Sequence, residues 1–402
     1  MIGTLVFALS LCAGEWDVYF KAEIATELRQ FESDDDMRTI DSGTAGFVRL
    51  ETSLKRGAFS VAARGFGRVD PKDHDRDNAS FEELFLSIDD RGWRVRAGYQ
   101  MLNWTATEAF HPADVMNARN FDSDIENPEK KGELMLSVRR RLPVGSIEAF
   151  YMPRMERPEL PGSRSRLSFA PPGFSTSEPL WLDDNGNLDT SDSRFQWGLR
   201  WNAVLGDADL SLHYLDHQDR LQPVVDVDVT SALVQPYYLP VHEYGGTYSQ
   251  VVGASIAKLE VGHKDFQWDA VPDHTQVAIG WEYGWISANG AAPTLIMEAQ
   301  NYFGVNESER AALGTFQRDL LVGYRHAFND IAGRELLVTV ITDLERSHEW
   351  LANLRYSQRL SDTWSVSAGL RYIDAPPKRT LAQGLELLDG ANQIFLTLKR
   401  FF

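Results

Sequence analysis

Apolar and polar positions alternate along most of the chain, and the segment WSVSAGLRYID (364–374) is representative. Large apolar residues, among them Trp364, Leu370 and Tyr372, occupy every second position, while Ser, Gly and Arg371 fill the positions between them. A period of two is typical of a β-strand with two unlike faces. Trp and Tyr at the ends of the apolar face indicate contact with lipid, because aromatic side chains gather at both interfaces of a membrane.

The same alternation recurs at 93–101, 195–204, 208–215, 276–285 and 349–358. Short connections rich in turn-forming residues alternate with longer ones, as in bacterial outer-membrane barrels, which have short periplasmic turns and long extracellular loops. The pattern predicts an all-β fold, a transmembrane antiparallel up-and-down β-barrel of about 18 strands with both termini on the short-turn side.

Two connections are less distinct than the rest. We expect a tight turn at 257–259, and we expect the aromatic-rich stretch 230–246 to belong to a long loop at 220–246. If either assignment fails, a barrel of about 16 strands becomes the alternative.

Composition narrows the class of protein. Of 402 residues, 43% are hydrophobic and 24% charged, and no run after the first dozen or so residues is apolar enough for a membrane-spanning helix. The formal net charge of −18 argues against nucleic-acid binding, which needs clustered positive charge. The single cysteine, Cys12, lies in the N-terminal apolar stretch, so the predicted mature domain, 15–402, has no thiol for a disulfide, a zinc ribbon or a nucleophile.

The two ends of the chain carry candidate targeting signals. The apolar run Ile2–Ala13, followed by small residues, predicts a cleaved signal peptide at 1–14. A lipid anchor on Cys12 and a buried N-terminal strand are the alternatives. The last segment, NQIFLTLKRFF, is amphipathic and ends in Phe402. It resembles the signal read by the outer-membrane assembly machinery, which is therefore an expected partner.

Arginine is frequent at the polar positions that would face the lumen. The residues expected to line the pore are Arg49, Arg64, Arg94, Arg96, Arg139, Arg141, Arg200, Arg325, Arg355 and Arg371, with Glu282 among the acidic residues of the same wall. Two interpretations stay open. The arginines could pair with carboxylates and stiffen the wall, or they could form a basic track for anions, since guanidinium binds carboxylates and phosphates through paired hydrogen bonds.

The connection at 102–131 is long, and Pro112 is suited to open a short helix that would reach Asn117. Its position and length resemble the third loop of trimeric general porins, which folds into the lumen. This resemblance makes Trp104, Asp114 and Arg119 candidate constriction residues and a homotrimer a possible assembly. The alternative is a solvent-exposed cap over the barrel mouth.

The same region resembles a family of poorly characterised proteobacterial outer-membrane barrels. The matching residues are Gly98, Gln100, Trp104, Pro112, Asp114, Asn117 and Pro153, whereas Tyr99 replaces the arginine and Thr105 the glycine of the family pattern. The resemblance covers roughly 60 residues. It implies an outer-membrane channel of undefined substrate without a particular catalytic group.

These observations predict a channel in the outer membrane of a Gram-negative bacterium for small hydrophilic solutes, biased towards anions or carboxylates. Its surroundings would be outer-membrane lipid and lipopolysaccharide, and no nucleic acid, metal or cofactor is expected. One alternative is a structural or adhesive barrel plugged by the loops 154–193 and 220–246. A hydrolase is another, because Asp209, Ser211 and His213 share one strand face, although no third group is seen to orient a base.

Overall fold

The computed structural model describes residues 16–32, 40–171, 173–189, 194–221, 223–269, 271–378 and 382–402, so the predicted signal peptide at 1–14 lies outside the described residues. Eighteen strands form one sheet. They are β1 (Asp17–Phe31), β2 (Ser42–Arg56), β3 (Phe59–Val69), β4 (Asn78–Asp90), β5 (Trp93–Gln100), β8 (Glu133–Arg141), β9 (Ser146–Met152), β13 (Gln196–Leu205), β14 (Ala208–Gln218), β17 (Pro240–Val252), β18 (Ser255–Phe266), β19 (His274–Gly284), β20 (Ala292–Phe303), β21 (Asp319–Ala327), β22 (Glu335–Asp343), β23 (Trp350–Arg359), β24 (Trp364–Asp374) and β25 (Gln393–Phe401).

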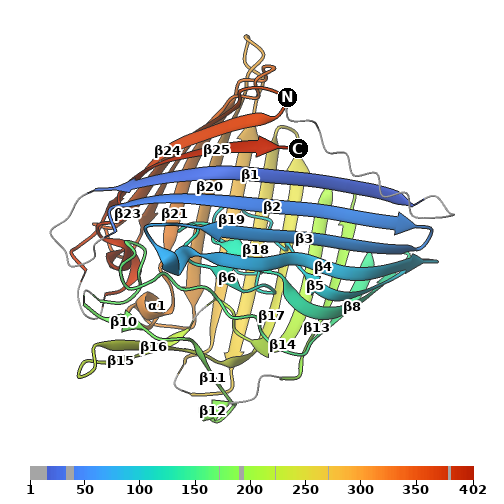
Figure 1. Cartoon of the computed structure of the whole chain (residues 1–402). Helices are drawn as coiled ribbons and strands as arrows, with labels where there is room; N and C mark the ends of the chain where they lie inside the picture. The colour runs from blue at the N-terminus through green and yellow to red at the C-terminus, as the bar shows by residue number, and fades with distance from the viewer. Residues whose placement is uncertain are drawn as a thin grey trace.

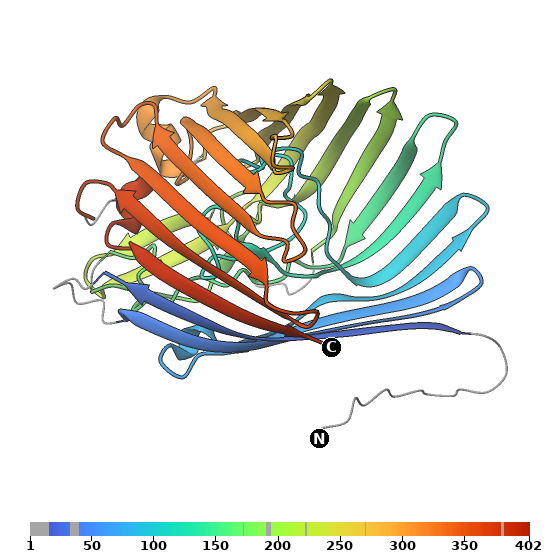
Figure 2. The same cartoon turned by 90° about the horizontal axis from the view of Figure 1, so that it is seen from above.

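The sheet closes into a barrel, because the first strand pairs with the last (Figure 2). β1 and β25 run antiparallel, with Glu23 opposite Phe401 and Phe31 opposite Gln393. Every other neighbour in the ring is also antiparallel and next in chain order among the barrel strands. Closure pairs the backbone groups of all the strands, which a sheet must do to cross lipid. The predicted barrel of 18 strands is confirmed.

The two faces of the wall differ as the alternation predicts. Leu370 and Tyr372 of β24 are 47% and 49% exposed on the outside, whereas Arg371 between them is 4% exposed and points inward. Rings on the outer face follow one another at the end of β19, where Tyr283 stacks on Trp281 of the same strand and on Trp285 just after it. Apolar side chains thus lie outside and charged ones inside, the reverse of their placement in a water-soluble protein, and this fits an outer face that meets hydrocarbon.

Short and long connections lie at opposite ends of the barrel. The short ones are 57–58, 91–92, 142–145, 206–207, 253–254, 285–291, 328–334 and 360–363. β1 begins opposite the end of β2, and β25 ends opposite Glu23 in the first half of β1, so both termini of the barrel lie at the short-turn end.

The turn expected at 257–259 is wrong. β17 and β18 are joined at 253–254, where Gly253 has a φ of 62°, a conformation that favours glycine. Lys258 therefore lies within β18. The long loop expected at 220–246 ends earlier, because 240–246 belong to β17.

The long connections carry further elements that gather at one end of the barrel (Figure 1). A small sheet contains β10 (Ser175–Thr176), β11 (Leu180–Leu182), β12 (Leu188–Asp189), β15 (Val224–Asp228) and β16 (Leu233–Tyr238). The strands β6 (Arg119–Asn120) and β7 (Glu129–Lys130) form a separate pair. The remaining elements are the helix α1 (Glu307–Leu313) and the 3-10 turns η1 (His74–Arg76) and η2 (Gly384–Leu388). In the described parts of the chain, every helix is too short or too polar to span a membrane.

Apolar cores form inside the barrel where loops fold back onto the wall. Leu385 and Leu388 of η2, for example, pack with Leu351 and Ile373 of the wall. The loops thus have their own hydrophobic anchors, which hold them in defined positions.

Candidate functional site

The connection from β5 to β8, residues 101–132, enters the barrel and crosses its interior (Figure 2). We call it the lumen loop. Its contacts reach separate parts of the ring, since Glu108 pairs with β18, Asp124 with β24 and Glu129 with β3. These contacts place the loop within the barrel and not above its mouth.

The helix expected from Pro112 to Asn117 does not form, and the segment consists of turns and bends. Asp114 Oδ1 accepts a hydrogen bond from the backbone N–H of Trp104 at 3.0 Å, and Asn117 Oδ1 accepts one from Leu102 at 2.8 Å. Side chains of this kind offer the backbone an alternative to helical hydrogen bonds. The lumen loop is therefore tied into a compact fold by its own polar residues.

Glu260 of β18 binds the backbone of the lumen loop. Its Oε1 accepts hydrogen bonds from the N–H groups of Ala106 and Thr107 at 2.5 and 2.8 Å, and its Oε2 accepts one from Ala113 at 3.2 Å. The hydroxyl of Thr107 donates to the same carboxylate at 2.7 Å. Glu260 is fully buried, so these donors replace the water that a carboxylate needs.

Two further contacts hold the same side of the loop. Glu298 of β20 accepts hydrogen bonds from the backbone N–H groups of Glu108 and Ala109 at 2.5 and 2.9 Å. The Glu108 side chain lies 2.9 Å from Lys258 Nζ and 3.0 Å from Arg325. Although burial opposes ionisation, these two cations lower the pKa of Glu108 to about 2. Its ion pairs therefore persist well into acidic conditions.

The opposite side of the loop is held by arginines of β24 and β23. The Arg371 guanidinium pairs with both Asp124 and Glu126, and Asn353 donates to Glu126 at 3.3 Å. Arg355 lies 3.7 Å from Asp124. Because Arg371 is 4% exposed, its pairing is shielded from salt and solvent.

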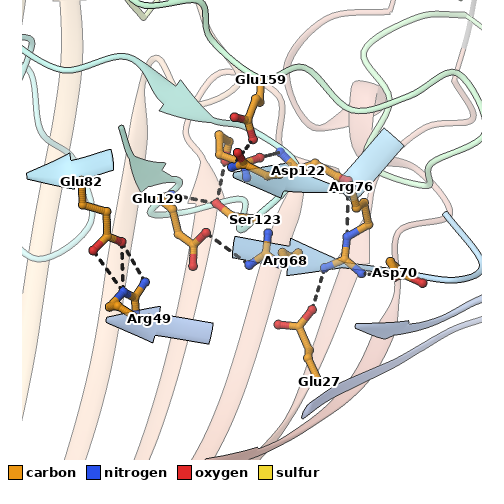
Figure 3. Close-up of polar contacts among 12 residues, drawn as sticks. Glu27, Arg49, Arg68, Asp70, Arg76, Glu82, Asp122, Ser123, Glu129 and Glu159 are labelled. Atoms are coloured by element: carbon orange, nitrogen blue, oxygen red, sulfur yellow. Dashed lines mark hydrogen bonds and ion pairs between the residues drawn. The ribbon is translucent and has the colours of Figure 1, made fainter. Parts of the chain in front are cut away.

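A third attachment joins the lumen loop to β1, β3 and the connection at 70–77 (Figure 3). Arg76 lies between Asp70 and Glu27, with a distance of 2.6 Å to each, and its Nε is 3.4 Å from Asp122. Arg68 pairs with Glu129 at 3.2 Å. The buried arginines thus bind carboxylates from several segments at once, and they fix the lumen loop against this wall.

Asp73, next to this cluster, provides a pH-dependent prediction. Burial together with the neighbouring carboxylates raises its pKa from 3.8 to about 6. The penalty for its ionised form is absent below its ordinary pKa and complete above about pH 6. We expect Asp73→Asn to stabilise the protein by about 1 kcal/mol at pH 7.5 and to have no effect near pH 4, measured by thermal unfolding. The exposed Asp362 of the turn at 360–363 gives the control, and an equal effect of Asp362→Asn would contradict the assignment.

The candidate constriction residues Trp104, Asp114 and Arg119 are all buried, with exposures of 3%, 2% and 5%. Asp114 lies 2.7 Å from Arg119 and 2.6 Å from Lys130, and these cations lower its pKa against the effect of burial. They therefore hold the lumen loop together from within. Their role in narrowing a pore stays a prediction.

Most of the predicted lumen arginines have acidic partners. The pairs are Arg49–Glu82 at 2.9 Å, Arg64–Glu82 at 2.8 Å, Arg94–Asp89 at 2.5 Å, Arg325–Glu108 at 3.0 Å, Arg355–Asp124 at 3.7 Å and Arg371–Asp124, and Glu282 in turn pairs with Lys258. Arg141 is exposed at the short-turn end of β8. This pairing fits the interpretation that arginines stiffen the wall.

Three arginines differ from the others. In the described structure no ion pair links Arg96, Arg139 or Arg200 to a carboxylate. The Arg96 guanidinium lies over the Phe85 ring, Arg200 lies over Trp104, and Arg139 donates to Ser146 at 2.9 Å. They lie on β5, β8 and β13. β8 neighbours β5, and β9 lies between β8 and β13, with Glu148 of β9 opposite both Arg139 and Arg200 in the register. We call these three residues the basic wall.

The row of Asp209, Ser211 and His213 does not assemble as a catalytic group. Ser211 shares a hydrogen bond with Thr247 at 2.7 Å, whereas the His213 ring packs against Trp104 and lies 3.6 Å from Glu243. His213 is thus engaged by other residues, and a hydrolytic role is not supported by this geometry.

Sequence reasoning missed the carboxylates that hold the loops. Glu298 lies on the inward face of β20, where the alternation would have placed it. Glu260 lies within β18, next to the turn expected at 257–259, and that expected turn interrupts the strand pattern that would assign Glu260 to the inner face. Their backbone partners lie more than 140 positions away, so no local signal indicates the contacts.

Comparison with solved structures agrees on the fold. No family model and no curated protein matches the sequence. The barrel is similar to OpdQ of Pseudomonas aeruginosa, with a TM-score of 0.55, 10% identity and coverage of 96% of this chain and 97% of that one. It is also similar to OccD3 (OpdP) of the same organism, with a TM-score of 0.54, 9% identity and coverage of 96% of this chain and 91% of that one. For OccK3 (OpdO), again from this organism, the TM-score is 0.53 and the identity 12%, with coverage of 96% of this chain and 95% of that one.

The likeness covers nearly the whole chain, although so few residues are identical that it concerns the fold alone. It joins two observations made above, the closed ring of 18 strands and the apolar face turned outward. Together they give the chain the fold of a porin-like β-barrel with an outer face suited to lipid.

Proposed function

We propose that the protein is a channel through which small hydrophilic solutes diffuse across the outer membrane of a Gram-negative bacterium, with a preference for anions. The observation that carries the preference is the basic wall. Arg96, Arg139 and Arg200 face the lumen and have no carboxylate at ion-pair distance among the residues that the structure describes, whereas most of the other inward arginines are paired with one. Glu148 lies opposite two of them, so the three arginines and this carboxylate together leave a net positive charge on the wall, and charge on a pore wall biases which ions pass.

Planar-bilayer recording tests this proposal. In a KCl gradient the purified protein is expected to give stable open steps, with a reversal potential on the chloride-selective side. The triple variant Arg96→Gln/Arg139→Gln/Arg200→Gln should lower the anion-to-cation permeability ratio about fivefold, because a unit charge about 4 Å from an ion in water contributes about 1 kcal/mol.

Arg140 gives a matched control for the basic wall. It lies on β8 beside Arg139, but its guanidinium covers the outer ring of Trp93. Arg140→Gln should leave the permeability ratio unchanged. A cation-selective wild-type channel would contradict the anion preference and leave the channel itself standing.

A plugged structural or adhesive barrel is the second candidate. The specific observation in its favour is the attachment of the lumen loop to separate parts of the wall, together with apolar loop cores inside the long-loop half. A protein inserted into bilayers that never opens would favour this function over the channel.

We further propose lipid and lipopolysaccharide as the surroundings of the outer wall, and a homotrimer as a possible assembly.

Phe402 is 55% exposed, and its backbone N–H donates to Ala22 at 2.9 Å at the end of the seam between β25 and β1. This position suits recognition by the assembly machinery. Deleting Phe402 and measuring how much of the variant protein is incorporated into outer membranes tests that proposal.

A further inference from the structure

A cavity of about 510 Å³ lies between the lumen loop and the other long connections. Its lining comes from distant parts of the chain, including Phe121 of the lumen loop, Phe169 and Val225 of the two following long connections, Phe316 after α1, and Leu387 of η2. A volume of this size matches sites that bind small organic molecules. We call it the vestibule.

The vestibule is mainly apolar. Phe121 and Phe169 meet edge to face with ring centroids 5.9 Å apart, and Phe110 lies 6.1 Å from Phe316. Phe121, Phe169 and Phe316 are only partly buried, so their rings have surface left to offer a ligand. A purely water-filled pathway has no need for so many aromatic and aliphatic groups, because each exposed apolar surface is unfavourable in water.

Each charged side chain that lines the vestibule in the described structure already has an internal partner. Arg119 lies 2.7 Å from Asp114, and Lys264 lies 2.7 Å from Asp219. Asp124 and Glu126 are both paired with Arg371. His111 lies 3.6 Å from Glu260. Among its described lining residues, the vestibule therefore presents no unpaired charge to attract an ion, in contrast to the basic wall.

Neutral polar groups occupy one side. Gln276 of β19 and Gln300 and Tyr302 of β20 line the vestibule from the barrel wall. Both amide nitrogens already have partners, since Gln276 Nε2 lies 3.0 Å from His274 Nε2 and Gln300 Nε2 donates to Asp319 at 3.4 Å. An amide oxygen has two lone pairs, so it can accept from a ligand hydroxyl in addition to its internal contacts. One side of the vestibule thus suits an apolar ring and the other a hydroxyl-bearing head.

We propose that the vestibule is a binding site for uncharged amphipathic solutes that have an aromatic body and a hydroxyl-rich polar head. The inference rests on the proposed function in one respect, that such a solute would pass through this chamber on its way to the pore. Binding itself requires no open channel.

Phenyl β-D-glucoside and methyl β-D-glucoside form a suitable pair of probes, because they share the polar head and differ in the apolar part. Saturation-transfer NMR on the full-length protein in nanodiscs should show transfer to the phenyl ring and little to the methyl compound. Phe169→Ser should weaken the phenyl glucoside affinity about tenfold, since it removes an aromatic contact. Val225→Asn, at a position that is 51% exposed and tolerant of a polar residue, should weaken it in the same direction.

Leu188 provides the matched control, because it is an exposed apolar residue of the same long connection as Phe169 but does not line the vestibule. Leu188→Ser should leave the affinity unchanged. Equal binding of both glucosides, or full affinity in both Phe169→Ser and Val225→Asn, would overturn the proposal. A silent protein in bilayers that still binds phenyl glucoside would overturn the channel and not the vestibule.

Discussion

Glu260→Ala is expected to raise the single-channel conductance severalfold and to make the open current noisy. The substitution leaves the buried N–H groups of Ala106, Thr107 and Ala113 without their acceptor. An unsatisfied buried donor costs about 1–3 kcal/mol, so several together would outweigh the packing that keeps this part of the lumen loop in place. Released from β18, the loop would no longer cross the lumen in one position. Bilayer recording measures the conductance, and limited proteolysis measures the exposure of residues 101–132.

Two variants separate loss of this attachment from general damage. Glu260→Gln keeps acceptor capacity in its amide oxygen and should change the conductance much less. Glu51→Ala removes an inward carboxylate of β2 that makes no hydrogen bond to the lumen loop in the described structure, and it should behave like the wild type. If Glu260→Ala gave wild-type conductance and a protease-resistant loop, the attachment would not control the lumen.

The barrel could be predicted from the sequence because lipid and lumen act on alternate residues of each strand. Trp364, Leu370 and Tyr372 had to face one solvent, and Arg371 had to face the other, so a single segment indicated both faces. Turn positions were less certain where both sets contain apolar or small residues. Around Gly253 the sequence VVGASIA alternates weakly, so the pattern does not locate the turn, and the turn expected at 257–259 lies several residues after the observed one.

The site was only partly predictable, because the residues that pair within it lie far apart along the chain. Alternation placed Arg371 on the inner face correctly, but its partner Glu126 lies 245 positions away in a loop. Whether an inward arginine is neutralised depends on such partners, and they follow from the path of the lumen loop. The basic wall consists of inward arginines for which the described structure shows no acidic partner at ion-pair distance. The sequence could therefore indicate an arginine-rich lumen, whereas only the structure separates paired from unpaired arginines.

Arg220→Met is expected to destabilise the protein by about 3–5 kcal/mol, because it leaves the carboxylate of Glu133 buried without its cation. Arg220 and Glu133 are both fully buried, and Arg220 Nε lies 2.9 Å from Glu133. The same carboxylate accepts hydrogen bonds from the backbone N–H groups of Ala118 and Glu156, each at 3.1 Å. One charge thus joins the lumen loop to the next two long connections. The midpoint of thermal unfolding and proteolysis of residues 219–239 measure the effect.

Arg157 offers a matched control, because its pair with Glu178 at 3.2 Å is 58% and 81% exposed. Arg157→Met should cost less than about 1 kcal/mol, since water screens an exposed pair. The double variant Arg220→Met/Glu133→Gln removes the stranded charge and keeps an acceptor for Ala118, so it should recover most of the lost stability. If the double variant were no more stable than Arg220→Met, the loss would come from the packing of the arginine side chain and not from the buried charge of Glu133.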